Sequence, residues 1–171
     1  MDFKKLIPDF GAIGRTEWGK PYVDTKNNAW LIMTCAAALM VVFVFIPWFS
    51  ATQSGWGMTV TATRFGITTW YGILGLIFTL VALYGILYKQ MQFVFWGAVL
   101  AVVMGLIGWL SMADVNTTVL GVKRELTVAE IKQDLQWDPN AYTFGHIGAI
   151  LFFFTSAALA VFSFLQINKE K

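Results

Sequence analysis

Residues 70–112, WYGILGLIFTLVALYGILYKQMQFVFWGAVLAVVMGLIGWLSM, decide the fold of this chain. They form two apolar runs, 70–88 and 91–112, which are separated only by Lys89 and Gln90. A membrane-spanning helix needs about 20 apolar residues at a rise of about 1.5 Å per residue, so each run is long enough to cross a bilayer. Because the joint is so short, we expect the two helices to lie antiparallel as one hairpin.

Two further apolar runs, 29–49 and 144–165, flank this hairpin. Of the 171 residues, 57% are hydrophobic and only 13% are charged, whereas soluble domains carry about 25% charged residues. The sequence therefore predicts an all-α membrane protein, a four-transmembrane-helix bundle. A net charge of +2 gives no indication of a nucleic-acid partner.

The distribution of lysine and arginine predicts the orientation of the bundle. We expect residues 1–28 to form a cytoplasmic or interfacial N-terminal arm, and residues 29–171 to form the four-span membrane domain. One side of the membrane would then carry eight basic residues, namely Lys4, Lys5, Arg15, Lys20, Lys26, Lys89, Lys169 and Lys171. The other side would carry four, namely Arg64, Lys123, Arg124 and Lys132. Cytoplasmic loops are enriched in such residues, so we expect both termini in the cytoplasm, and from the small size a bacterial inner membrane.

Two longer loops, 50–69 and 113–143, are expected on the outer side. In the first loop, threonines alternate with apolar residues over 58–63, a period-two pattern that predicts a short strand or hairpin. In the second, 116–120 and 122–126 flank Gly121 and predict a small hairpin. Thr127 and Glu130 have the spacing of a helix capping box, which predicts a small amphipathic helix over 128–137.

Small residues line one face of several spans at helical spacing, and such faces let membrane helices approach closely. They include Gly72, Gly75, Gly97, Ala101, Gly105, Gly108 and Gly145. We expect these faces to pack within the bundle, although the same faces could bind another protein's helix or a flat ligand. The tryptophans near the span ends, Trp30 and Trp48 among them, are expected to anchor the helices at the membrane interface.

The spans contain no aspartate, glutamate, lysine or arginine, which argues against a pump, a proton-coupled transporter or a voltage sensor. The single cysteine, Cys35, excludes a dithiol mechanism within one chain. The single histidine, His146, is expected to form structural hydrogen bonds. Its alternatives are an axial ligand of a porphyrin or chlorin, or a general base beside Asp114 or Asp138. We expect Arg64 to contact solvent or lipid headgroups, and the alternative is a specific contact with a partner or an anionic lipid.

The order of segments resembles the claudin-type four-span arrangement: a short inner tail, a strand-like first outer loop after a tryptophan, a tight inner turn and a second outer loop. The resemblance covers topology only, because the paired cysteines of that family are absent, and it assigns no residue a role.

The leading functional hypothesis is a non-catalytic integral membrane subunit or accessory protein that contacts membrane lipids. It would bind a larger membrane protein complex or form a homo-oligomer. The alternative is a four-helix membrane protein that binds a lipid, a quinone or a pigment. A third hypothesis is an outer-face membrane enzyme that uses His146 with a loop carboxylate.

Overall fold

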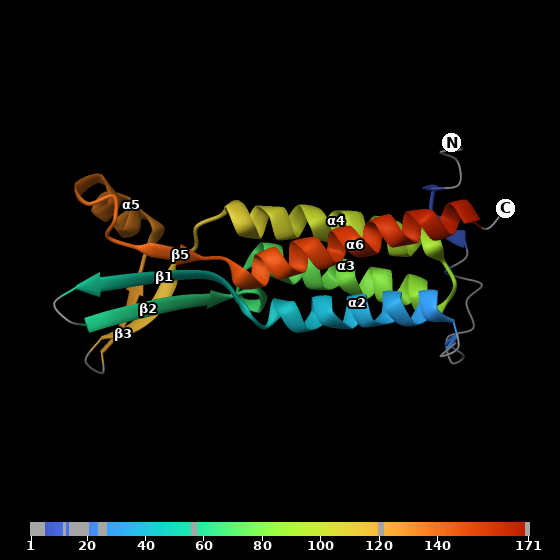
Figure 1. Cartoon of the computed structure of the whole chain (residues 1–171), viewed down its shortest axis with the longest axis horizontal. Coiled ribbons are helices and arrows are strands. Elements are labelled where there is room, and N and C mark those ends of the chain that lie inside the picture. Colours follow the sequence, from blue (N-terminus) through green and yellow to red (C-terminus); the bar gives the residue numbers. More distant parts are fainter. Residues whose placement is uncertain are drawn as a thin grey trace.

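The computed structural model describes residues 6–11, 13, 21–23, 27–55, 58–119 and 122–169, with only the backbone at 54–55, 58–60, 116–119 and 122–125. In this part of the chain, four helices lie side by side as a bundle, and a small sheet extends from one end of it (Figure 1). The bundle helices are α2 (Asn28–Val44), α3 (Trp70–Leu87), α4 (Met91–Leu110) and α6 (Ile147–Lys169). α2 begins and α6 ends at the end of the bundle opposite the sheet (Figure 1).

Three of these helices, α3, α4 and α6, have the length and apolar composition of membrane spans, as in an integral membrane protein. α2 is apolar but has only 17 residues. The prediction of a helical span over 29–49 is wrong at its far end, because the helix ends at Val44 and Pro47 already begins strand β1. The predicted fourth span, 144–165, begins three residues too early, because Thr143–Gly145 is strand β5, and its helix continues to Lys169.

The structure is mostly helical, as expected, but the loops 50–69 and 113–143 both contribute to a single sheet, so the fold is not all-α. The strands are β1 (Pro47–Gly55), β2 (Met58–Phe65), β3 (Val115–Val119), β4 (Val122–Leu126) and β5 (Thr143–Gly145). Their order in the antiparallel sheet is β4-β3-β2-β1-β5. The two predicted hairpins are confirmed as β1–β2 and β3–β4, and the pairing of Thr63 with Asn116 joins them.

The predicted amphipathic helix is confirmed as α5 (Val128–Trp137), and it begins with the expected capping box. The Thr127 side chain accepts a hydrogen bond from the backbone of Glu130, and the Glu130 carboxylate accepts one from the backbone of Thr127. α5 packs on the sheet through Ile131, which is buried in a small core with Phe49, Val115 and Tyr142. The sheet, α5 and this core form one module, here called the sheet module.

The joint between α3 and α4 is as tight as the sequence predicts. Lys89 has a positive φ of 56°, and the backbone N–H of Gln90 donates to the carbonyl of Gly85 over 2.7 Å. A Cβ on Gly85 would lie 2.7 Å from the backbone nitrogen of Val94, so the close return of the chain requires glycine there. The two helices are thereby held antiparallel.

Trp48 joins the sheet module to the bundle. It is completely buried, which contradicts the prediction that it anchors the chain at the membrane interface. Its indole N–H donates to the carbonyl of Phe43 over 2.8 Å, and its ring lies against Tyr71 and Phe152. Trp30 is also buried, at the other end of the bundle. A tryptophan at a helix end can therefore belong to the protein core rather than to the lipid interface.

Candidate functional site

The small residues singled out in the spans lie against other parts of the same chain. A Cβ on Gly97 would lie 2.8 Å from the backbone of α3, one on Gly105 3.0 Å from Phe153, and one on Gly75 3.1 Å from Phe152. Gly72 lies against the backbone of Gly66, Gly108 lies against the Trp48 ring, and Ala101 is completely buried. Contacts within this chain therefore occupy these faces.

Gly145 lies in β5, not in α6 as the prediction placed it. Its carbonyl accepts a hydrogen bond from the Ser50 hydroxyl over 3.2 Å, and a Cβ would lie 2.6 Å from that hydroxyl oxygen. The residue therefore belongs to the contact between β1 and β5, where its small size lets Ser50 approach.

His146 lies directly before α6, where the backbone N–H of Ile150 donates to its carbonyl. Its ring packs against Phe49 at a centroid distance of 5.2 Å. Burial lowers the pKa of the imidazole below its usual value, and the hydrogen bond to the backbone of Ser111 opposes this only in part. Of the carboxylates considered as its partners, Asp114 accepts from the backbone of Val128, and Asp138 accepts from the backbone of Asn140.

A pocket of about 320 Å³ lies where the sheet module meets the bundle, here called the junction pocket. It lies at the start of α3, at the end of α4 and at the start of α5. Its lining residues are Arg64, Thr68, Thr69, Trp70, Tyr71, Met112, Ala113, Asp114 and Val128. Trp70 is 61% exposed, whereas Tyr71 beside it is only 5% exposed.

Two polar atoms in the junction pocket are buried without a hydrogen-bond partner. The Arg64 guanidinium donates through Nη2 to the carbonyl of Thr68 over 3.2 Å, but its Nε makes no hydrogen bond. The Tyr71 hydroxyl lies beside the Thr69 side chain but does not meet the geometry of a hydrogen bond either. Leaving a buried polar group unpaired costs about 1–3 kcal/mol, so such atoms need an explanation.

Asp114 adds a carboxylate to the same pocket. Its Oδ1 accepts from the backbone N–H of Val128 over 2.7 Å, which fixes the carboxylate at the start of α5. The junction pocket therefore contains one cationic and one anionic side chain, supplied by the loops 50–69 and 113–143. The sequence pattern indicates Arg64 but not Tyr71, because only the fold brings the loop 113–143 against the start of α3 and forms a pocket there.

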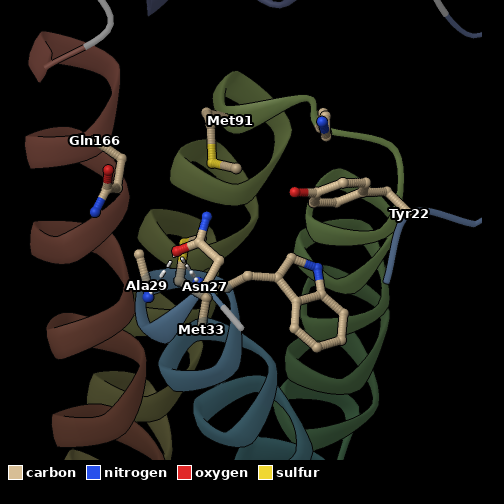
Figure 2. A pocket seen from close by; sticks show the side chains of 8 residues that line it. Tyr22, Asn27, Ala29, Met33, Met91 and Gln166 are labelled. Carbon is tan, nitrogen blue, oxygen red and sulfur yellow. Dashed lines mark hydrogen bonds between the residues drawn. The ribbon is translucent and has the colours of Figure 1, made fainter. Parts of the chain in front are cut away.

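A smaller pocket of about 160 Å³ lies at the opposite end of the bundle, where α2 begins (Figure 2). The Asn27 side chain caps α2 by accepting from the backbone of Ala29 and Trp30, and Met33 and Met91 add apolar atoms. The Lys89 ammonium lies 3.6 Å from the centre of the Tyr22 ring, a cation–π contact that ties part of the N-terminal arm to the bundle. The Trp30 indole N–H, which also lines this pocket, is buried without a partner.

Two more contacts hold described parts of the N-terminal arm on the bundle. The Trp96 indole N–H donates to the carbonyl of Leu6 over 2.7 Å, and the Phe10 ring meets Phe93 edge-on. The rest of the predicted arm, residues 1–5, 12, 14–20 and 24–26, lies outside the described residues.

Among the described residues, no three histidine, cysteine, aspartate or glutamate side chains gather closely enough to hold a metal ion. Comparisons with protein-family models, with curated proteins and with solved structures give no match.

Proposed function

We propose that this chain is a non-catalytic integral membrane subunit or accessory protein whose sheet module binds a larger membrane partner. All four bundle helices cross the membrane in this proposal. At about 1.5 Å per residue, the 17 residues of α2 cover about 26 Å, close to the hydrocarbon thickness of about 30 Å. The sheet module then stands outside the bilayer.

The observation that carries the proposal is the exposure of Trp137, the last residue of α5. It is 85% exposed, although tryptophan is the largest apolar side chain and the sheet module faces water. α5 is fixed beneath it, because Ile131 is buried in the module and the Tyr142 hydroxyl donates to Asp134 over 2.6 Å. An exposed tryptophan on a packed helix is typical of the residues that dominate the binding energy of protein interfaces.

Replacing Trp137 with alanine is expected to remove the partner without unfolding the chain. Interface residues of this kind contribute 2 kcal/mol or more, so affinity should fall about 30-fold. Tagged protein is extracted from native membranes in mild detergent and read by native gel and mass spectrometry. Lys132→Ala, an exposed position on a different face of the same helix, is the matched control and should retain the partner.

A stoichiometric complex that Trp137→Ala abolishes and Lys132→Ala keeps would support the proposal. If the only associated chain is a second copy, the partner is the protein itself and the homo-oligomer is the assembly. A wild-type chain that leaves native membranes as a monodisperse monomer would contradict the proposal.

The second candidate function is binding of a lipid, a quinone or a pigment, and the unpartnered Arg64 and Tyr71 atoms in the junction pocket favour it. Quinones and pigments absorb light, so the absorption spectrum of protein purified from native membranes separates them from lipids. The third hypothesis, an outer-face enzyme, requires that His146→Ala abolish the activity.

A further inference from the structure

We propose that the junction pocket binds the headgroup of a zwitterionic phospholipid that carries a primary amine, with the phosphate at Arg64 and Tyr71 and the ammonium at Asp114. This inference depends on the membrane placement proposed above but not on partner binding through Trp137.

Two side chains with hydrogen-bond donors, Arg64 and Tyr71, line the junction pocket. The Arg64 Nε and the Tyr71 hydroxyl are buried atoms that do not meet the geometry of a hydrogen bond within the protein, although the Thr69 side chain lies beside the hydroxyl. Tyr71 is 5% exposed, so its hydroxyl is well shielded from bulk water. A phosphate offers several acceptor oxygens, and guanidinium groups bind phosphate with more than one N–H. A phosphate in the pocket would therefore offer acceptor oxygens to the Arg64 and Tyr71 side chains.

The carboxylate decides which anion fits. Asp114 lines the same pocket, and the hydrogen bond from Val128 fixes it through Oδ1. A ligand that carried only negative charge would be repelled by this side chain. A ligand with a phosphate and a primary ammonium complements both charges, because the ammonium supplies three donors to the carboxylate. The pair of charges therefore favours a zwitterion over a purely anionic headgroup.

The position of the pocket points to a lipid. It lies where α3 begins and α4 ends, so in a membrane crossed by the bundle it stands at headgroup level. Trp70 at 61% exposure and Met112, which is also exposed, belong to its lining. Exposed tryptophan is typical of this level of the bilayer. These two side chains supply an apolar rim along which the glycerol and acyl part of a lipid can lie.

The size of the pocket separates a headgroup from a larger cofactor. Pockets for small ligands have volumes of about 300–1,000 Å³, and at about 320 Å³ the junction pocket lies at the lower end of this range. This volume suits a compact headgroup whose chains stay outside the pocket, whereas a porphyrin or chlorin needs more room.

The test uses the full chain in nanodiscs of equimolar phosphatidylethanolamine, phosphatidylglycerol and phosphatidylcholine, with native mass spectrometry to count the lipids that stay bound. The wild type should retain one phosphatidylethanolamine in preference to the other two. Arg64→Gln should lower this retention about tenfold or more, because it removes a charge-assisted hydrogen bond, and Arg64→Lys should lower it less. Tyr71→Phe, which removes only the hydroxyl, should lower it about threefold. Lys132→Gln, an exposed cation on α5 outside the pocket, is the control and should change nothing.

Asp114→Asn gives the sharpest result. Asparagine still accepts the Val128 N–H through its side-chain oxygen, so the start of α5 is kept, while the charge that selects the amine is lost. The variant should retain phosphatidylglycerol as well as phosphatidylethanolamine. A purely structural role of Asp114 would leave the selectivity unchanged and would overturn the proposal.

Three other results would overturn it. The first is that the wild type retains no lipid, and the second is that it prefers phosphatidylglycerol. The third is that soluble phosphoethanolamine displaces the bound lipid at equal concentration. The last result would mean that the headgroup chemistry is right but that the ligand is a soluble amine phosphate. Partner binding through Trp137 is read in a separate experiment, so the two proposals can fail independently.

Discussion

Replacing Trp48 with alanine is expected to lower the thermal unfolding midpoint of the detergent-solubilised protein by roughly 6–20 °C. Tryptophan-to-alanine changes in a packed core cost about 3–5 kcal/mol. In a chain of this size, each kcal/mol corresponds to about 2–4 °C. The expected shift follows from these two magnitudes.

The packing of Trp48 explains why the cost should be at the upper end. Its ring occupies the space left by glycines of four different segments: a Cβ on Gly66, Gly108 or Gly148 would lie 2.5–2.8 Å from a ring atom, and one on Gly75 would lie 3.5 Å away. No side chain on those glycines can move in to fill the space that alanine would leave. The cavity would remain at the point where β1, α3, α4 and α6 meet.

Two variants separate the contributions to this effect. Trp48→Phe keeps an aromatic ring but loses the hydrogen bond to Phe43, so it should recover more than half of the lost stability. Trp70→Ala removes the same side chain from an exposed position and should shift the midpoint by only a few degrees. Equal shifts for Trp48→Ala and Trp70→Ala would show that the sheet module is not held through Trp48.

The helical hairpin at 70–112 could be predicted closely, because the sequence features that determine it are local. Two apolar runs and a two-residue joint leave little choice, and the observed α3 and α4 fall within one or two residues of the predicted ends. α5 could be predicted for the same reason, since the capping box and the helical spacing of its apolar residues Val128, Ile131 and Leu135 lie within about ten residues of sequence.

The sheet could be predicted only in pieces. Each hairpin has a local pattern, but the pairing of Thr63 with Asn116 and of Ser50 with Gly145 joins residues far apart in the sequence. A hydrophobic period in the sequence indicates a strand or a helix, but it does not indicate which distant strands pair. The expectation of an all-α fold is therefore incomplete, and the expected fourth span includes Phe144 and Gly145 of β5 because they directly precede the apolar helix.

The candidate site was the hardest part to predict. Arg64 stood out as the one charge of its loop, but Tyr71 and Asp114 belong to other segments, and only the fold places all three around one pocket. Trp48 was misassigned because an aromatic residue at the end of an apolar run looks the same in sequence whether it faces lipid or core. The four glycines that make room for the Trp48 ring lie in other segments, so its burial follows from contacts that are distant in the sequence.

Gly97→Leu is expected to prevent formation of the folded bundle, and Gly97→Ala to cost about 1–3 kcal/mol. A Cβ at this position would lie 2.8 Å from both the backbone nitrogen of Ala82 and the carbonyl oxygen of Phe78 in α3. These are backbone atoms of a facing helix, so only a separation of α3 from α4 can relieve the clash. Small residues give membrane helices their close packing, and losing that approach removes the attraction along the whole hairpin.

The matched comparison is Gly75→Ala. The nearest atom to its Cβ would be Cζ of the Phe152 ring at 3.1 Å, which is a side-chain atom that can shift by a few tenths of an ångström. Alanine is also the better helix former by about 1 kcal/mol, so the unfolding midpoint should change by only a few degrees in either direction. Val103→Leu on the exposed face of α4 controls for added volume alone and should be neutral. The four variants are compared by their size-exclusion profiles and their thermal unfolding midpoints in one detergent. A Gly97→Leu protein that elutes and melts like the wild type would contradict the close approach of α3 and α4. A Cβ at Gly97 already lies 2.8 Å from backbone atoms of α3, so there is no room for a leucine side chain between the two helices.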